Sequence, residues 1–162
     1  MDRQPVETKR DLVLPFLRDA GLVQDDPPAA LDAILVAAGD RLKVAGDILD
    51  YDDFFVADAD LAYDDTALEK RLRKPDEAAG LLASFRERLE TAESFDAESL
   101  EALMRGFVED EGIKLGQIIH AVRVATTGKG VGFGMFETLE ILGRDSVLAR
   151  IDRALGLVST GP

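Results

Sequence analysis

The stretch "LGQIIHAVRVATTGKGVGFGMFETLEILG", residues 115–143, decides the architecture of this chain. In its first half, apolar side chains recur at intervals of three and four residues, which is typical of the buried face of an α-helix. Glycines then occupy positions 128, 130, 132 and 134, and a second helical pattern begins at once. The stretch therefore predicts two helices joined by a loop that carries few side chains.

Helical periodicity recurs over most of the remaining sequence. Asp96 precedes one apolar stripe as an N-cap residue would, and Gly112 follows it as a C-terminal stop. Residues 47–65 break the pattern with eight aspartates and no basic residue, and we expect an irregular segment there, held by its aromatic side chains. The sequence predicts an all-α protein with two small helical subdomains, residues 1–74, which include this acidic segment, and residues 75–162.

The charge of the chain is strongly negative but unevenly distributed. The net charge of −13 argues against a polyanionic partner. Residues 1–111 carry 13 basic and 28 acidic side chains, however, whereas residues 112–162 carry six basic and four acidic ones. If an anionic partner binds, we expect it at this C-terminal third.

Composition excludes several classes of site. The chain has no cysteine, which excludes disulfides, thiolate metal sites and a cysteine nucleophile, and its single histidine excludes a site that needs two. The acidic segment lacks the spacing of a calcium loop, so we expect no metal and no cofactor. No apolar run is long enough to span a membrane, and the first residues lack the core of a signal peptide, so we expect a cytoplasmic protein.

The glycine loop admits three interpretations. It is a phosphate-binding loop if a strand precedes it, although the preceding window has helical period and no Walker motif is present. It is a tight turn between packed helices if the glycines only relieve backbone strain. It is a contact surface for an unpaired nucleotide if main-chain groups, Arg123 and Lys129 lie beside an apolar platform, Phe133 or Met135.

The order of short motifs over residues 8–157 resembles that of the C-terminal region of glutamyl-tRNA synthetases. That family typically reads "LKLGK…QPLRVALTG…GPGLFELLELLGKE…LERI", and "LVLPFLRDAGL" and "GDRLKVAGDILDYDDFFV" fit its earlier motifs. The matching positions at the C-terminal end are Leu115, Gly116, Arg123 to Ala125, Thr127, Gly128, Gly134, Phe136, Glu137, Leu142, Gly143 and Arg150-Ile151.

The resemblance implies a helical region that grips the anticodon arm of glutamate tRNA. Carried over by position, Gly132, Phe133, Gly134 and Met135 would touch a splayed base. Arg123 would steady the loop or a phosphate, with Lys129 beside it, and Arg41 or Lys43 would contribute from the first subdomain. The family's proline in the loop is Phe133 here, and its "QP" pair is His120-Ala121.

The resemblance assigns no catalytic residue to this chain. The ATP-binding motifs of the family's catalytic domain, HIGH and KMSKS, are absent from the sequence, so we expect the chain to be inactive alone and to act with a catalytic domain in cis or in trans. It would be either a fragment of a longer synthetase or a freestanding paralogue that serves as a protein-interaction module. A nucleotide-binding enzyme is the least favoured alternative.

Two further basic features have ordinary explanations. His120 lies away from the apolar stripe of its helix, where we expect a solvated side chain rather than a general base. Lys70, Arg71, Arg73 and Lys74 form the densest basic run, and we expect these side chains to form ion pairs with the nearby Glu69 and Glu77 rather than contacts with RNA.

Overall fold

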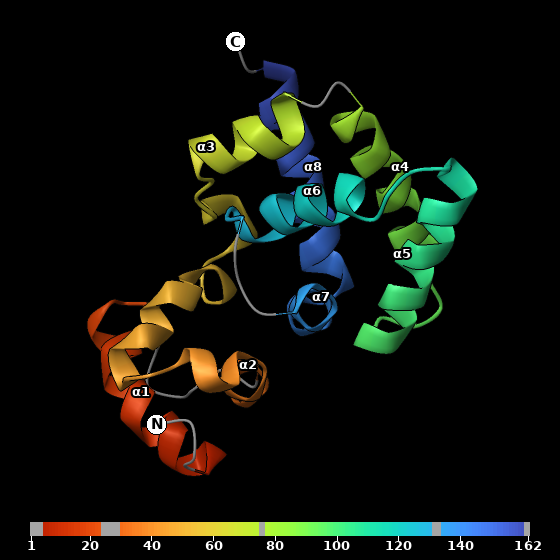
Figure 1. The fold of residues 1–162 in the computed structure, drawn as a ribbon. Coiled ribbons are helices and arrows are strands. Elements are labelled where there is room, and N and C mark those ends of the chain that lie inside the picture. The colour runs from red at the N-terminus through yellow and green to blue at the C-terminus, as the bar shows by residue number, and fades with distance from the viewer. Residues whose placement is uncertain (1–4, 24–29, 75–76, 131–133, 161–162) are drawn as a thin grey trace. The chain divides into compact units, whose positions relative to one another are not determined.

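The computed structural model describes residues 5–23, 30–74, 77–130 and 134–160. All regular structure in these ranges is helical, and no strand occurs among them, which confirms the all-α prediction. The chain forms two compact units, residues 1–56 and residues 57–162 (Figure 1).

The first unit is a small helical cluster. Helices α1 (Val6–Asp19) and α2 (Leu31–Ala38) are followed by the 3₁₀ turns η1 (Gly39–Arg41) and η2 (Ala45–Phe54). α1 packs against both α2 and η2 because each presents an apolar side to it. The fully buried side chains of the first unit include Val13, Leu17, Ile34, Leu35, Leu42 and Ile48.

The acidic segment is more regular than the sequence predicts. Most of it forms η2 and the short turn η3 (Asp58–Asp60). Asp47 accepts hydrogen bonds from the backbone N–H groups of Lys43 (2.8 Å) and Val44 (3.1 Å), so its side chain fixes the start of η2. Asp47 acts through local backbone bonds, as expected for an aspartate. The segment combines 3₁₀ turns, with a break in η2 at Tyr51, and irregular chain at residues 61–64.

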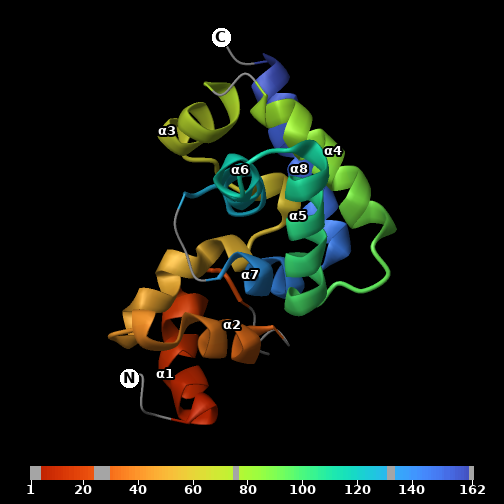
Figure 2. The ribbon, with the colours of Figure 1, turned by 45° about the vertical axis from the view of Figure 1, so that its right-hand side comes forward.

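The second unit holds the larger core. It continues through α3 (Asp65–Leu68), a π-helical turn η4 (Glu69–Arg73), α4 (Ala78–Thr91), α5 (Ala97–Glu111), α6 (Gly116–Thr127), α7 (Met135–Leu142) and α8 (Arg144–Thr160). α8 runs beside α4 and α6, as both views show (Figures 1 and 2). The two helices predicted around the glycine loop are α6 and α7, and both are confirmed.

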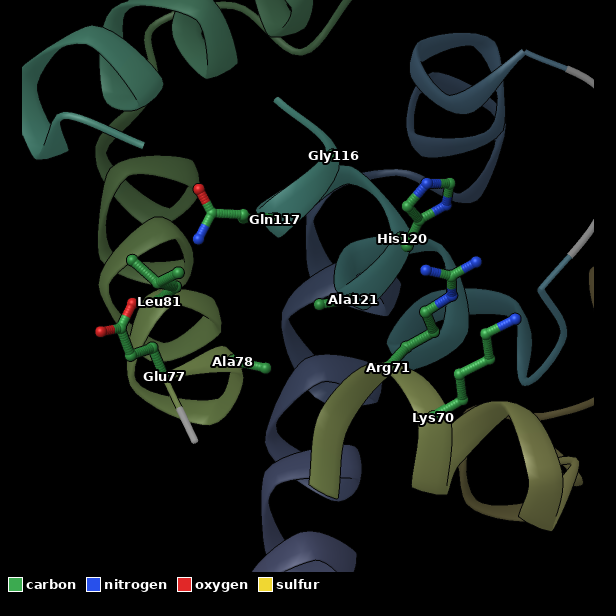
Figure 3. A pocket seen from close by; sticks show the side chains of 9 residues that line it. All are labelled: Lys70, Arg71, Glu77, Ala78, Leu81, Gly116, Gln117, His120 and Ala121. Atoms are coloured by element: carbon green, nitrogen blue, oxygen red, sulfur yellow. The ribbon is translucent and has the colours of Figure 1, made fainter. Parts of the chain in front are cut away.

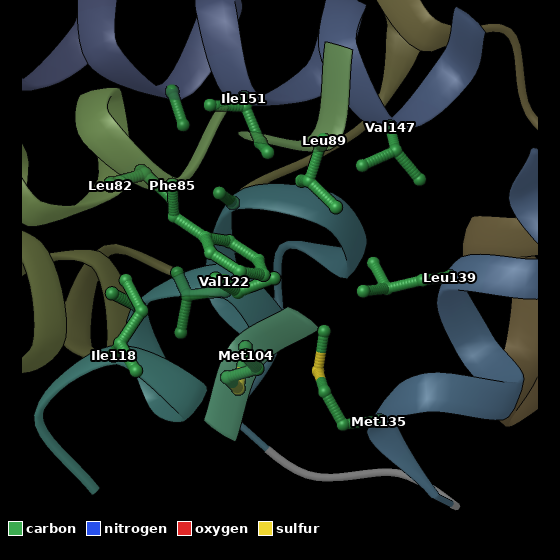
Figure 4. Close-up of a cluster of buried hydrophobic side chains, with 14 of the residues drawn as sticks. Leu82, Phe85, Leu89, Met104, Ile118, Val122, Met135, Leu139, Val147 and Ile151 are labelled. Carbon is green, nitrogen blue, oxygen red and sulfur yellow. The ribbon is translucent and has the colours of Figure 1, made fainter. Parts of the chain in front are cut away.

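Aromatic and aliphatic side chains from five helices meet in the centre of this unit (Figure 4). Phe85 and Phe107 are fully buried and pack edge to face, with ring centroids 5.3 Å apart. Asp96 caps α5 by accepting a hydrogen bond from the N–H of Ser99 (2.8 Å), and Gly112 ends that helix with a φ of +65°. Both cap predictions are therefore confirmed.

Residues 57–74 pack with the second unit rather than the first. Leu68 and Leu72 are buried members of its core. The hydroxyl of Tyr63 lies within hydrogen-bonding distance of the carbonyl oxygens of Ala125 (2.7 Å) and Arg150 (3.0 Å). The compact units thus divide after Val56. The subdomain boundary predicted after residue 74 stays a prediction that fragment stability can test.

Candidate nucleic-acid interface

The glycine loop begins at the C-terminal end of α6, where the chain turns sharply. Gly128 is buried and left-handed, with a φ of +77°. A Cβ at this position would overlap the carbonyl oxygen of Ala62 and lie 3.3 Å from the Cα of Tyr63. The carbonyl of Gly128 also accepts a hydrogen bond from the N–H of Asp64 (2.8 Å). This glycine therefore serves the turn and the packing of its own chain, and no partner is needed to explain it.

A hydroxyl connects the loop to the last turn of α6. Thr127 donates its hydroxyl proton to the carbonyl of Arg123 (2.8 Å), and its oxygen accepts the N–H of Lys129 (3.2 Å). Thr127 is buried, whereas Arg123 and Lys129 are half-buried. Two of the predicted RNA-binding residues are thus held at one end of α6 by the same side chain.

The remaining described glycines of the loop differ from Gly128. Gly130 is exposed, and a Cβ there would meet only the Cβ of Ala67 at 3.9 Å. Gly134 is exposed at the N-cap of α7, where the carboxylate of Glu137 folds against it. Main chain at these two positions is accessible, which the contact-surface interpretation requires.

Three predicted residues remain at the far side of the loop. Gly132 and Phe133 lie outside the described residues. The side chain of Met135 is 3% exposed and belongs to the core (Figure 4), so it offers no open stacking surface. The phosphate-loop interpretation needs a strand before the glycines, and α6 occupies that place, so this alternative is excluded.

The first unit carries the other two predicted residues. Arg41 ends η1 and is exposed, and Lys43 follows it and is also exposed. The backbone N–H of Lys43 donates to Asp47, which places a carboxylate against the main chain of Lys43.

Half of the six cations in the C-terminal third maintain the fold. Arg150 is 2% exposed and binds Asp58 (2.7 Å) and the carbonyl of Thr126 (2.9 Å). Arg153 donates to the carbonyl of Asp58 and stacks over Tyr63. Arg144 donates to the carbonyl of Ala92 and lies over the ring of Phe95. The count of basic residues in residues 112–162 is therefore larger than the number of cations that can contact an anion there.

A pocket of about 440 Å³ lies at the other end of α6, between that helix, η4 and α4. Lys70 and Arg71 reach it from η4, and His120 reaches it from α6; the three side chains extend along the same side of the pocket (Figure 3). Glu77, Leu81 and Gln117 lie on its other side.

Burial and the charges around this pocket both change the pKa of His120. Burial lowers the pKa of its imidazole below 6.5, and the positive charges of Arg71, Arg123 and Lys70 lower that pKa further. The predicted ion pairs of the basic run occur only in part. Arg73 pairs with Glu69 (3.5 Å), but within the described residues neither Lys70 nor Arg71 forms an ion pair. The sequence pattern does not reveal this cluster because η4 and α6 are distant in the chain.

The described part of the chain contains neither a group of side chains suited to a metal ion nor a helix suited to spanning a membrane. Its His, Asp and Glu side chains form no group of three that could hold a metal ion. None of its helices combines the length and the apolar composition needed to cross a bilayer.

Comparison with known proteins identifies the family. Residues 9–155 match the family described as "Anticodon binding domain". The chain is 38% identical over 147 residues to a glutamate–tRNA ligase of Moorella thermoacetica, covering 88% of this chain and 30% of that protein. It is 39% identical over 132 residues to a glutamate–tRNA ligase of Streptomyces avermitilis, covering 82% and 26% respectively.

The fold also has a close counterpart among solved structures. A glutamate tRNA ligase from Elizabethkingia meningosepticum CCUG26117, solved in complex with its amino acid, superposes with a TM-score of 0.82 at 20% identity. The alignment covers 96% of this chain and 30% of that one. The chain thus spans less than a third of the length of these relatives. It belongs to the anticodon binding domain family and matches the C-terminal part of glutamate–tRNA ligases.

Proposed function

We propose that this chain binds the anticodon arm of glutamate tRNA, as the RNA-binding part of a glutamate–tRNA ligase in cytoplasmic protein synthesis. A catalytic domain acts with it in cis or in trans. The family match over residues 9–155 is the observation that carries this proposal. The accessible main chain at Gly130, next to Lys129 in the sequence, supports it.

Within the proposed site the residues have different tasks. The exposed main chain at Gly130 approaches an unpaired base, and that at Gly134 does so once the carboxylate of Glu137 moves away from it. Arg123 and Lys129 supply positive charge for the adjoining phosphates. Met135 contributes through its main chain, because its side chain is buried. Gly132 and Phe133 remain proposed members of the same loop, and Arg41 and Lys43 proposed members on the first unit.

A binding titration with glutamate tRNA tests this function. At low salt we expect saturable binding, and affinity should fall as salt rises, with a slope of log K against log salt of about −2 to −3 for three or four phosphate contacts. A tRNA of equal length with a different anticodon loop should compete less well, since loops are read by unstacked bases. The absence of saturable binding at low salt would refute the proposal.

A second candidate function rests on the first unit. The described residues include five large hydrophobic side chains that are exposed, and all lie within residues 1–56: Leu12, Phe16, Val36, Val44 and Leu49. Exposed apolar side chains mark protein contacts where they join into a contiguous patch. A freestanding protein-interaction module would use this unit, with a synthetase catalytic domain as its partner. Calorimetric titration of the chain with such a domain would detect it, and Val36→Asp should weaken the complex.

A further inference from the structure

The pocket beside α6 is the best candidate for a site beyond the glycine loop. Lys70 from η4 and His120 from α6 extend along one of its sides together with Arg71, although 49 residues separate Arg71 from His120 in sequence. A second, larger hollow of about 800 Å³ also includes Lys70, but Asp65 and Glu69 line it as well and offset its cations. With His120 neutral, the charged residues of each hollow sum to +1, but only the smaller pocket places an imidazole beside its two cations, Lys70 and Arg71.

In the part of the chain that the structure describes, the charges of Lys70 and Arg71 do not stabilise the fold through ion pairs. Most of the arginines in the second unit are held in ion pairs or on carbonyl groups, for example Arg86 on Asp152 and Arg88 on Asp110. Within the described ranges Lys70 and Arg71 form no such pair. A protein with a net charge of −13 has many carboxylates that could neutralise them, so two unneutralised cations beside an imidazole are informative.

α6 connects this pocket to the glycine loop. His120 and Arg123 are half-buried and follow the i, i+3 spacing that places side chains on one face of a helix, and the buried Thr127 lies one turn further on, where the loop begins. From His120 to Gly128 the helix rises by about 12 Å, at ~1.5 Å per residue. A single strand of RNA covers such a distance in a few nucleotides. The pocket and the loop can therefore contact the same strand.

We propose that Lys70, Arg71 and His120 bind one backbone phosphate of the RNA whose unpaired bases lie against the glycine loop. This site rests on the proposed function, and it extends the RNA surface along the polar face of α6 to η4. Arg71 offers a planar fork of N–H donors and Lys70 a point charge, both suited to phosphate oxygens. Glu77, on the other side of the pocket, opposes an anion that fills the whole cavity, which limits the site to one phosphate group.

Phosphate binding is coupled to the protonation of His120. In the free chain burial lowers the pKa of His120 below 6.5, and the cations Arg71, Arg123 and Lys70 lower it further because they disfavour the imidazolium. A bound phosphate neutralises this field and favours the imidazolium, so the pKa of His120 rises in the complex. By linkage, the affinity for RNA increases as the pH falls through this range.

The experiment combines RNA titration with an NMR titration of His120, whose imidazole C–H signals are assigned at once because it is the single histidine. The probe is an anticodon stem–loop RNA of glutamate tRNA, added to the full chain at low salt. The variants are Lys70→Gln and Arg71→Gln, singly and together. Arg105→Gln is the matched control, since it removes the same charge from an exposed side chain on α5.

We expect each pocket variant to weaken RNA binding about fivefold, and the double variant more than tenfold, with the salt slope reduced by about 1 per lost contact. Arg105→Gln should leave the affinity within twofold. The pKa of His120 should rise on RNA binding in the wild type but not in the double variant. Circular dichroism checks that all variants are folded.

The outcomes separate this site from the function on which it rests. If the wild type binds RNA while the double variant binds as tightly as Arg105→Gln and the pKa of His120 stays unchanged, the phosphate site is refuted and the anticodon function stands. If the wild type binds no RNA, both are refuted. A rise in the pKa of His120 with millimolar inorganic phosphate but not with RNA would identify a free-anion site and overturn the RNA assignment.

Discussion

At Gly128 the backbone is left-handed and packs directly against the carbonyl of Ala62. Gly128→Ala should therefore lower the free energy of unfolding by more than about 2 kcal/mol, because it adds a strained φ to a steric overlap. Gly130→Ala is the control, since a Cβ there has only an ordinary contact with Ala67. Urea denaturation measures both variants. Equal stabilities would show that the close approach to Ala62 does not constrain the loop.

Arg150 is a buried cation with a defined set of partners. Replacing it with methionine would leave the carboxylate of Asp58 and the carbonyl of Thr126 without their donor. We expect Arg150→Met to destabilise the fold by about 3–5 kcal/mol. Arg105→Met, at an exposed side chain, should change stability by less than about 0.5 kcal/mol. A small effect at both positions in thermal and urea unfolding would contradict the assigned role.

Tyr63 is expected to resist ionisation. Burial raises its pKa from 10.0 to about 12, and the nearby Arg153 and Arg150 reduce this rise only in part. Because the folded pKa is the higher one, the contribution of the neutral phenol to stability is complete below pH 10.0 and is lost between pH 10.0 and about 12. Tyr51→Phe leaves Tyr63 as the sole tyrosine, so the tyrosinate absorbance reports it alone. A midpoint near 10 in the folded variant would contradict this environment.

Among the elements, the segment α3–η4 is the one whose position matters for the proposed phosphate site. Asp64 caps it by accepting a hydrogen bond from the N–H of Ala67 (3.1 Å), whereas the neighbouring Asp65 lies in the first turn without such a cap. We expect Asp64→Ala to reduce stability by about 1 kcal/mol and Asp65→Ala to have a smaller effect. Amide hydrogen exchange of residues 66–73 should increase in the first variant. The same exchange rates in both variants would show that the cap does not hold this segment.

The sequence predicts elements well where local physics decides them. α6, α7, the Asp96 cap and the Gly112 stop follow from periodicity and capping chemistry. The acidic segment was less predictable, because alternating aspartates and aromatics fit turns and 3₁₀ helix equally well.

The candidate site was predictable only in part, since tertiary packing decides which cations stay available. The resemblance includes Gly128 and Arg150, yet the structure shows that both hold the fold together. Conversely, Lys70 and Arg71 were expected in local ion pairs, and only the fold brings them to His120. The sequence pattern alone does not separate a structural cation from an available one.

At the scale of the whole molecule, the division into two units predicts how fragments behave. Residues 57–162 should unfold cooperatively on their own, because they contain the complete second core. Residues 75–162 lack Leu68, Leu72 and the Asp58 partner of Arg150, and each buried leucine contributes about 1.5–3 kcal/mol. We expect this shorter fragment to be largely unfolded, given total stabilities of about 5–15 kcal/mol. A cooperative transition in residues 75–162 would instead support the boundary predicted after residue 74.

RNA binding along one face of α6, from the loop to η4, is the property we propose for this chain of net charge −13. The most direct measurement is an NMR titration of the ¹⁵N-labelled chain with the anticodon stem–loop RNA at low salt. We expect the largest amide shifts at Lys129, Gly130 and Gly134, and further shifts along α6 to His120 and into η4. Absence of shifts at saturating RNA, or shifts confined to residues far from α6 and the loop, would contradict this proposal.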